Sequence, residues 1–528
     1  MKKITICLTL LLGALLGKAQ QNCPIIPKPV TAIKQTGEFV IKRNMGILIS
    51  AKVLDTAATY LQKELQHLNK LNLAISRKAA TSGIKLMLDN TIRGSEGYRL
   101  KMTTTSVMIS GSTTHGVFNG VISFLQLVTL SKSALAVDCW DITDAPNYAW
   151  RGVMLDESRH FMGKEKVKQL LDWMAFYKLN HFHWHLTDEP AWRLEIKRYP
   201  KLALIGGMGS TTNKNDPAKY YTQQEVSEII NYAAERHIVV IPEIDMPGHA
   251  TAANRAYPEY SGGGSPGHPD FTFNPGNMAT YTYLANILKE TIALFPSGMI
   301  HMGGDEVSIG NEKWKTDAGI ASLMQQQKLS TLSEVEHYFM KRMADSVYRA
   351  HAKLLVWDEM ANAGLPVDST IIFWWRHDKP GQLRLALSKG YPTVVCPRLP
   401  FYYDFVQDST HKNGRKWNNK LYNSLQDVYS FSLTEMNLTQ SELNNVLGIQ
   451  ANLWTETVAT AKRMDYLLFP RITALAEAAW TAPANKAWPD FMSRLKFNLG
   501  LYDKAGLYYY DPFIPVAHPE PIKQAGGR

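Results

Sequence analysis

The chain has 528 residues, of which 45% are hydrophobic, 10% aromatic and 20% charged. This composition excludes a disordered, collagen-like or coiled-coil protein, and the length is sufficient for at least two domains. The formal net charge is +10, but the Lys and Arg residues are scattered rather than gathered in a basic stripe, so a nucleic-acid partner is not expected.

The first 19 residues have the pattern of a secretory signal peptide. Lys2 and Lys3 precede an apolar stretch that runs from residue 4 to residue 16, and Gly17-Lys18-Ala19 offers a small-x-small cleavage site. We therefore expect an exported protein, located in the periplasm, at the cell surface or outside the cell. No later apolar run reaches the ~18 residues that a membrane span needs, so no transmembrane segment is expected.

Three of the four cysteines follow the predicted signal peptide, namely Cys23, Cys139 and Cys396. An odd number in an oxidising compartment permits at most one internal bridge. Cys23 and Cys139 both flank the first predicted domain, so a disulfide between them is left open. Cys396 has no evident base beside it and is expected to be a buried, small apolar residue rather than a nucleophile.

Residues 20–145 predict a small α+β domain. Short β-like runs at 39–41, 84–88, 98–102 and 106–110 alternate with two stretches of helical spacing, 57–68 and 117–130. The turn-forming sequence Asp144-Ala145-Pro146-Asn147 marks the end of this domain.

Residues 146–505 predict a (β/α)8 barrel, the TIM-barrel fold, and residues 506–528 form a tail without a clear pattern. Short apolar runs alternate with amphipathic stretches, as in a parallel sheet wrapped in helices. The eight expected strands are 152–156, 181–186, 238–244, 299–303, 354–357, 370–375, 392–396 and 446–451. The expected helices are 164–177, one that begins at Thr222 with a Thr-x-x-Glu capping box, 280–294, 334–350, 473–480 and 491–499. Residues 397–442 are a long, poorly periodic insertion, which in a barrel belongs to the catalytic face.

Polar and aromatic residues follow the predicted strands at their carboxyl ends, where such a barrel carries its active site. Carboxylates mixed with tryptophans suggest a sugar site, because aromatic rings stack on the apolar faces of a pyranose and acids protonate glycosidic oxygens. The polar residues are Asp156, Glu157, Arg159, His160, Asp188, Glu189, Glu243, Asp245, His249, Asp305, Glu306, Asp358, Glu359, Asp404 and Glu456, and the tryptophans are Trp184, Trp357, Trp374, Trp375 and Trp454.

Two clusters have more than one interpretation. In His301-Met302-Gly303-Gly304-Asp305-Glu306 the glycines would end a strand and let a ligand approach two carboxylates, although neighbouring acids are also common in solvated loops. His181, His183 and His185 share one face of a strand. They could ligate zinc, but no Glu-x-x-His companion is present, and a structural role is favoured.

Four motifs resemble those of glycoside hydrolase family 20, the β-N-acetylhexosaminidases. They are Arg151-Gly152-x-x-Leu155-Asp156-x-x-Arg159-His160-Phe161, His183-Trp184-His185-Leu186-Thr187-Asp188, Pro242-Glu243-Ile244-Asp245-Met246-Pro247-Gly248-His249 and His301-Met302-Gly303-Gly304-Asp305-Glu306. Each motif alone is weak, but four in this order on successive strands are specific. The resemblance extends over residues 25–499 and includes the small first domain.

The resemblance implies an exo-acting, retaining enzyme that removes terminal β-linked N-acetylglucosamine or N-acetylgalactosamine from glycans, without a metal or cofactor. In that family the nucleophile is the 2-acetamido carbonyl oxygen of the substrate, and an oxazolinium-type intermediate forms. Glu306 matches the general acid/base. Asp305 matches the residue that orients the acetamido group and stabilises its developing charge.

The resemblance also implies a set of substrate-binding residues. Arg151, whose sequence position alone does not decide its role, resembles the arginine that binds the sugar hydroxyls, and Asp188 with His249 resembles the polar pair behind the acid/base. The other matches are Trp357, Trp375 and Trp454 as walls, Tyr402 and Asp404 as a Tyr-x-Asp motif whose tyrosine bonds the acetamido oxygen, and Glu456 as the acid for the distal hydroxyls. Trp374 could replace Trp375, and Tyr403 could replace Tyr402.

Three alternatives stay open at this point. The first is a related glycosidase that releases a disaccharide, as a lacto-N-biosidase does, or that accepts sulfated sugars; the loops at 206–221 and 397–442 would set the depth of such a site. The second is a catalytically inactive glycan-binding protein, and the third is a zinc hydrolase. The sequence carries no signal for an oligomeric state.

Overall fold

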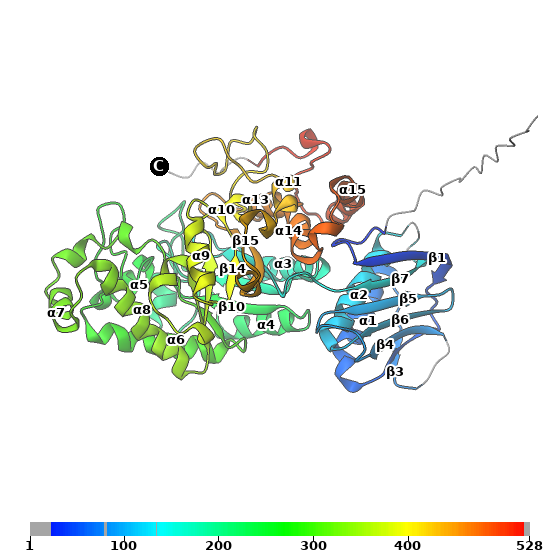
Figure 1. Ribbon diagram of the computed structural model, residues 1–528, viewed down its shortest axis with the longest axis horizontal. Helices are drawn as coiled ribbons and strands as arrows, with labels where there is room; N and C mark the ends of the chain where they lie inside the picture. Colours follow the sequence, from blue (N-terminus) through cyan, green and yellow to red (C-terminus); the bar gives the residue numbers. More distant parts are fainter. Residues whose placement is uncertain (1–22, 79–81, 132, 134, 522–528) are drawn as a thin grey trace, which may run out of the picture.

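The computed structural model describes residues 23–78, 82–131, 133 and 135–521. A small sheet domain lies beside a larger helix-wrapped barrel (Figure 1). The predicted signal peptide lies outside the described residues. Among the helices described, none combines the length and the apolar character needed to cross a bilayer.

The small domain is a seven-stranded mixed sheet with two helices, α1 (Asp55–Asn69) and α2 (Thr114–Thr129), both of which the sequence predicts. The sheet order is β1-β7-β5-β6-β4-β2-β3. The strands are β1 (Thr31–Val40), β2 (Gly46–Ile49), β3 (Ala74–Ser76), β4 (Gly83–Leu88), β5 (Tyr98–Met102), β6 (Ser106–Gly111) and β7 (Ala136–Asp144). The sequence does not predict β2, β3 or β7, and β1 is longer than expected because most of its side chains are exposed and give no apolar pattern.

The described cysteines are all free thiols, so the disulfide left open between Cys23 and Cys139 does not form. Cys139 is fully buried in the core of the small domain, and Cys23 packs against the same core. Burial raises the pKa of both thiols, that of Cys23 to about 12. Cys396 is buried, as expected.

The eight predicted strands close into a parallel barrel, which confirms the fold class. In chain order they are β8 (Trp150–Asp156), β9 (His181–His185), β10 (Val239–Glu243), β11 (Met299–His301), β12 (Lys353–Trp357), β13 (Thr370–Trp374), β14 (Thr393–Val395) and β15 (Val446–Leu453). Parallel pairing of β15 with β8 completes the ring. One apolar cluster fills the space between strands and helices, and a second, rich in aromatic rings, lies inside the barrel.

Helices cover the outside of the barrel. They are α3 (Lys164–Phe176), α4 (Gln223–Ala234), α5 (Thr251–Ala256), α6 (Met278–Leu294), α7 (Ala318–Gln327), α8 (Leu332–Arg349), α9 (Pro380–Ser388), α13 (Ala461–Leu468), α14 (Arg471–Trp480) and α15 (Trp488–Lys504). The expected capping box of α4 is present: the Thr222 hydroxyl accepts from Glu225 N–H, and the Glu225 carboxylate accepts from Thr222 N–H.

The insertion after β14 carries only short helices, α10 (Arg398–Phe401), α11 (Leu425–Ser430) and α12 (Gln440–Asn444). The Arg471 guanidinium, buried on α14, donates hydrogen bonds to the carbonyls of Tyr403, Phe405 and Asn423. These hydrogen bonds from α14 therefore anchor the insertion to the barrel. The insertion follows the carboxyl end of β14, as the sequence predicts.

The two domains meet at the amino-terminal end of the barrel through buried charges. Lys178 Nζ lies 3.4 Å from Asp144 Oδ2, and both side chains are fully buried. Trp480 Nε1 donates to the other Asp144 oxygen at 2.9 Å. Because a buried charge that loses its partner is strongly destabilising, this contact ties the domains together.

Candidate active site

The predicted site residues, apart from Arg151, gather at the carboxyl ends of the barrel strands. Asp188 follows β9, His249 follows β10, and Asp305 with Glu306 follows β11. Trp357 ends β12, and the remaining residues follow later strands: Trp375 follows β13, Tyr402 and Asp404 follow β14, and Trp454 and Glu456 follow β15. This convergence is what the fold class requires of a catalytic centre.

Arg151 is the exception, and the prediction that it binds the sugar is wrong. It lies near the amino-terminal end of β8, where its fully buried guanidinium pairs with Glu96 of the small domain. It also donates to the carbonyls of Tyr148 and Lys178 at 2.8 Å each. Arg151 therefore belongs to the domain interface.

Arg159, in the loop after β8, occupies the position that was expected of Arg151. Its Nη1 lies 2.7 Å from Asp188 Oδ2, and its Nη2 lies 4.0 Å from Glu456 Oε1. Its guanidinium carbon is 5.1 Å from the Trp454 ring centroid. Arg159 is part of the first motif quoted above, and its place after the strand, rather than at its start, is the signal that distinguishes it from Arg151.

Glu306 and His249 lie close together in the site. Both have left-handed backbone conformations, which residues other than glycine rarely adopt. Both have φ = +53°, which costs a non-glycine residue about 1–3 kcal/mol. His249 Nε2 lies 3.8 Å from Glu306 Oε2 and 3.6 Å from Asp305 Oδ2. The Glu306 side chain is 44% exposed, whereas that of Asp305 is 12% exposed.

Gly303 and Gly304, which precede Asp305, leave room for protein side chains rather than for a ligand. A Cβ on Gly303 would lie 1.7 Å from Asp245 Oδ1, and one on Gly304 would lie 2.9 Å from Met360 Cγ. Both glycines have positive φ. The prediction that these glycines let a ligand approach is therefore wrong. Their lack of a side chain instead allows the backbone after β11 to pack against Asp245.

A chain of charges supports the two catalytic candidates. Asp188 binds His249 Nδ1 at 3.1 Å. Burial favours a neutral Asp188, but Arg159 and His249 outweigh it and hold the pKa of this carboxyl well below its usual value. Burial likewise opposes the charged form of His249, yet Asp188 and Asp305 raise the pKa of the imidazole well above its usual value. His249 is therefore a cation held behind Asp305 and Glu306.

Asp305 and Asp245 are carboxyls that resist ionisation. Burial, with the charges of Glu306 and Glu359, raises the pKa of Asp305 to about 7 although His249 opposes the shift. Burial and the Asp305 charge raise the pKa of Asp245 well above its usual value. The pair therefore retains a proton at neutral pH when no ligand is bound.

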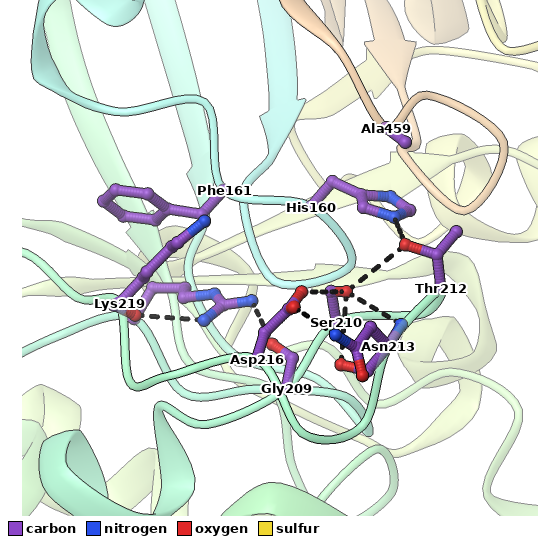
Figure 2. Close-up of a pocket in the computed structure, with 10 residues that line it drawn as sticks. His160, Phe161, Gly209, Ser210, Thr212, Asn213, Asp216, Lys219 and Ala459 are labelled. Atoms are coloured by element: carbon purple, nitrogen blue, oxygen red, sulfur yellow. Dashed lines mark hydrogen bonds between the residues drawn. The ribbon is translucent and has the colours of Figure 1, made fainter. Parts of the chain in front are cut away.

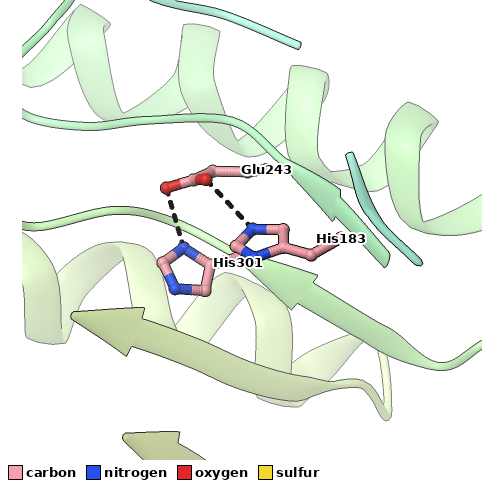
Figure 3. Close-up of side chains that lie close together, drawn as sticks. All are labelled: His183, Glu243 and His301. Carbon is pink, nitrogen blue, oxygen red and sulfur yellow. Dashed lines mark ion pairs between the residues drawn. The ribbon is translucent and has the colours of Figure 1, made fainter. Parts of the chain in front are cut away.

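Beneath these residues, Glu243 is enclosed by nitrogen atoms (Figure 3). Its oxygens lie 2.9 Å from His301 Nδ1 and 3.0 Å from His183 Nε2, and all three side chains are fully buried. These three residues could bring ligand atoms to a metal ion. However, Glu243 also accepts hydrogen bonds from Trp357 Nε1 and His185 Nδ1, so both of its oxygens are already engaged by donors. This arrangement favours a structural support over a metal centre.

The aromatic residues divide between the inside and the outside of the barrel. Trp357, Trp375, Tyr402 and Trp454 belong to the cluster inside the barrel. Trp374 and Tyr403, the two neighbours that could have replaced them, pack in the outer layer, where Tyr403 donates its hydroxyl to the Arg471 carbonyl. The structure thus places Trp375 and Tyr402, rather than their neighbours, inside the barrel with Trp357 and Trp454.

Several polar atoms at this end of the barrel are buried and form no hydrogen bond with the described residues. They are Asp305 Oδ1, His249 Nε2, both carboxylate oxygens of Asp404, Trp454 Nε1 and Glu456 Oε2. Arg415, from the insertion, lies 2.7 Å from Glu456 and 3.3 Å from Asp404, and sequence analysis did not identify it. Unused buried donors and acceptors suit a ligand with many hydroxyl groups.

Two cavities flank these residues. One of about 600 Å³ opens beside Glu306 and is lined by α8 and by the loops after β12, β13 and β14. The other, of about 450 Å³, lies under the loop at residues 207–221 (Figure 2). There, Thr212 Oγ1 lies 2.9 Å from His160 Nε2, and Asp216 accepts hydrogen bonds from Ser210 and Asn213.

Comparison with known proteins gives one consistent result. The profile "Glycosyl hydrolase family 20, catalytic domain" matches residues 148–483, and "Glycosyl hydrolase family 20, domain 2" matches residues 22–145. A beta-hexosaminidase of Porphyromonas gingivalis is 33% identical over 97% of this chain and 69% of its own length.

Solved structures agree. A GH20 exo beta-N-acetylglucosaminidase of Vibrio harveyi, in complex with N-acetylglucosamine, has a TM-score of 0.86 at 32% identity, over 94% of this chain and 79% of that one. A beta-N-acetylhexosaminidase of Bacteroides fragilis has a TM-score of 0.81 at 28% identity, over 92% and 96% of the two chains.

Proposed function

Because this chain belongs to glycosyl hydrolase family 20, we propose that it is an exo-acting β-N-acetylhexosaminidase that releases terminal β-linked N-acetylglucosamine or N-acetylgalactosamine from glycans. The observation that carries the proposal is the contrast between two adjacent acids after β11. Glu306 is open to solvent, as a proton donor to the leaving group must be, and Asp305 is buried beside it.

The reaction retains configuration and needs one protein acid. The substrate's acetamido carbonyl oxygen attacks the anomeric carbon while Glu306 protonates the departing oxygen, which gives an oxazolinium intermediate. Asp305, as a carboxylate, accepts a hydrogen bond from the acetamido N–H and stabilises the positive charge that develops there. Glu306 then removes a proton from water, which opens the ring at the anomeric carbon.

The unused polar atoms at the mouth supply sugar recognition. We assign Arg159, Asp404 and Glu456 to the hydroxyls of the terminal sugar because each has a buried polar atom that forms no hydrogen bond with the described residues, and Trp454 has an indole N–H in the same state. Tyr402 is assigned to the acetamido oxygen, and Trp357 and Trp375 to the walls around that group. Because this recognition uses the terminal hydroxyls, cleavage is from the chain end.

Substitution of the acid tests the proposal. Glu306→Gln is expected to lower kcat on an aryl β-N-acetylglucosaminide by about 10²–10⁴-fold, with an unchanged circular dichroism spectrum. Glu312→Gln, an exposed glutamate of the same segment, serves as the control and should retain activity. Near-wild-type turnover of the Glu306→Gln enzyme, or equal rates on a substrate without the acetamido group, would contradict the assignment.

We also propose that the enzyme acts outside the cytoplasm, on the basis of the charged and apolar pattern of residues 1–19. Expression in a bacterial host should yield periplasmic or extracellular protein that begins at Gln20. Leu11→Arg should retain the full-length chain in the cytoplasm. A wild-type product found in the cytoplasm with Met1 intact would refute export.

A further inference from the structure

The cavity of about 600 Å³ beside Glu306 extends beyond the residues assigned to the hydroxyls of the terminal sugar. Its lining includes Glu306, Glu336, Glu359, Trp375, Lys379 and Arg398, but none of Arg159, Tyr402, Trp454 or Glu456. Because Glu306 protonates the oxygen that leaves, the leaving group must lie on the side to which this carboxyl is open. The cavity volume is in the range of sites that enclose a ligand larger than one ring.

The arginines along this cavity are paired with carboxylates, whereas Lys379 is exposed to solvent. The Arg398 guanidinium lies 4.7 Å from the Trp375 ring centroid and 4.2 Å from that of Trp417, and it binds Asp378 at 2.5 Å. Arg376 binds Glu359 at 3.3 Å. Since these charges compensate one another, the wall suits a neutral, hydroxyl-rich group better than an ionic one.

Glu336, on α8, differs from its neighbours. It is only 9% exposed, it lines the cavity, and it forms no hydrogen bond or ion pair with any residue that the structure describes. Burial, with the charges of Glu359 and Asp305, raises its pKa to about 8 although Arg376 opposes the shift. At neutral pH this side chain is therefore an uncharged carboxyl, with one O–H to donate and one carbonyl oxygen to accept.

We propose that Glu336 is a specificity-determining residue of this cavity: by hydrogen-bonding the hydroxyls of a leaving sugar, it favours a sugar over an aryl leaving group. The inference rests on the proposed function and deepens it. A sugar hydroxyl is both donor and acceptor, and it meets both needs of a neutral carboxyl without leaving a buried charge unpaired. An aryl leaving group offers no such hydroxyls.

The test compares two substrates that share the terminal sugar. One is the disaccharide N-acetylglucosaminyl-β-1,4-N-acetylglucosamine, and the other is 4-methylumbelliferyl β-N-acetylglucosaminide. Glu336→Leu is expected to lower kcat/KM on the disaccharide about 10-fold and to leave the aryl substrate within about twofold. Glu336→Gln keeps a neutral donor and acceptor and should retain most of the disaccharide activity. Asp345→Asn, on an exposed position of α8, is the matched control and should change neither.

Each outcome decides the question. Equal losses on both substrates, or no loss with Glu336→Leu, would overturn the role of Glu336. If Glu336→Leu does not fold, Glu336→Asp, which withdraws the carboxyl by one methylene, should show the same selective loss. A wild-type enzyme that cleaves the aryl substrate but not the disaccharide would refute the sugar preference alone. Failure on both substrates would refute the proposed function itself.

Discussion

Asp305 and Glu306 are neighbours in the chain, but the fold gives their carboxyls different surroundings. Glu306 is open to the cavity on one side, whereas Asp305 lies against Asp245 and the His249 cation. Two identical chemical groups thus take two roles because burial and neighbouring charge differ between them. The sequence identified the pair, but their division of labour came from the family resemblance and is visible only in three dimensions.

The raised pKa of Asp305 predicts an effect on stability. Its pKa is about 7 in the folded protein, against an ordinary value of 3.8. Between these values the folded state binds more protons than the unfolded state, so this group lowers stability as pH rises from about 4 to 7. Asp305→Asn should therefore raise the thermal midpoint by about 1–3 °C at pH 8 and have almost no effect at pH 4.

Thermal melts of the inactive Asp305→Asn protein at the two pH values check this prediction. Asp345→Asn, at an exposed position, is the control and should show no such pH dependence. A variant that is destabilised at pH 8 would show that the Asp305 charge is favourable in the folded protein, which a raised pKa does not allow.

The position of Arg159 predicts a selective loss of binding. Its guanidinium lies beside Asp188, Trp454 and Glu456, so removal takes a charged hydrogen-bond donor from the sugar. Arg159→Met should lower kcat/KM by about 10–100-fold, with most of the change in KM, while the circular dichroism spectrum stays the same. Steady-state kinetics on the aryl substrate measure this, and a change of less than twofold would contradict the assignment.

Sequence reasoning expected the candidate site residues to follow the barrel strands, and apart from Arg151 they lie at or after the strands' carboxyl ends, because the carboxyl ends of parallel strands must meet. It chose the wrong arginine of the first motif because it followed the resemblance instead of that rule: Arg151 starts a strand and Arg159 follows one. Arg415 could not be predicted because it comes from the insertion after β14, which has no periodic pattern. Glu336 could not be predicted because the apolar pattern of α8 does not show that a cavity lies beside this helix.

At the scale of elements, the exit from β11 depends on a glycine. Gly303 has φ = +65°, and a Cβ there would lie 1.7 Å from Asp245 Oδ1. Gly298, just before the same strand, has φ = +62° with no atom within 4 Å of the corresponding position. The two glycines share a backbone conformation but differ in the space around them.

This difference predicts unequal effects of one substitution. Gly298→Ala should cost only the strain of a left-handed alanine, about 1–2 kcal/mol, and keep full activity. Gly303→Ala should in addition displace Asp245 or the Asp305 backbone, with a loss of activity of at least about 100-fold. Denaturant unfolding and kinetics on both variants check this. Similar behaviour of the two would mean that the Asp245 contact has no role.

Strands and helices could be predicted only where the sequence shows a regular pattern of apolar residues. The eight barrel strands are short, buried apolar runs, which the sequence shows directly. In the small domain, β2 and β3 are only 4 and 3 residues long, and β7 carries acids within its apolar run. The insertion after β14 has no periodicity to detect, because distant groups such as the Arg471 guanidinium fix its course.

At the scale of the whole molecule, the two domains share a buried ion pair. Arg151 on the first barrel strand binds Glu96 of the small domain, and Asn180 Nδ2 donates to the same carboxylate at 3.3 Å. Arg151→Met would leave Glu96 buried without its partner, which should cost about 3–5 kcal/mol of stability. At 25 °C the KM of the folded variant should not change, in contrast to that of Arg159→Met.

A second substitution tests the cause of that loss. Arg151→Met combined with Glu96→Leu removes both charges and should recover most of the stability, because an apolar pair of similar volume often replaces a buried ion pair without loss. Denaturant titrations of the two single variants and the double variant measure the coupling. Additive losses would show that the two side chains act independently.

The position of this ion pair also limits how the protein can be recombined. The cation is encoded within the barrel and its counter-ion within the preceding domain, more than fifty residues earlier in the chain. A chimaera that takes its first domain from a distant homologue would inherit one half of the pair without the other. Such a hybrid should accumulate in soluble form only when the donor supplies an acid at the matching loop position, so the two segments are expected to be inherited together.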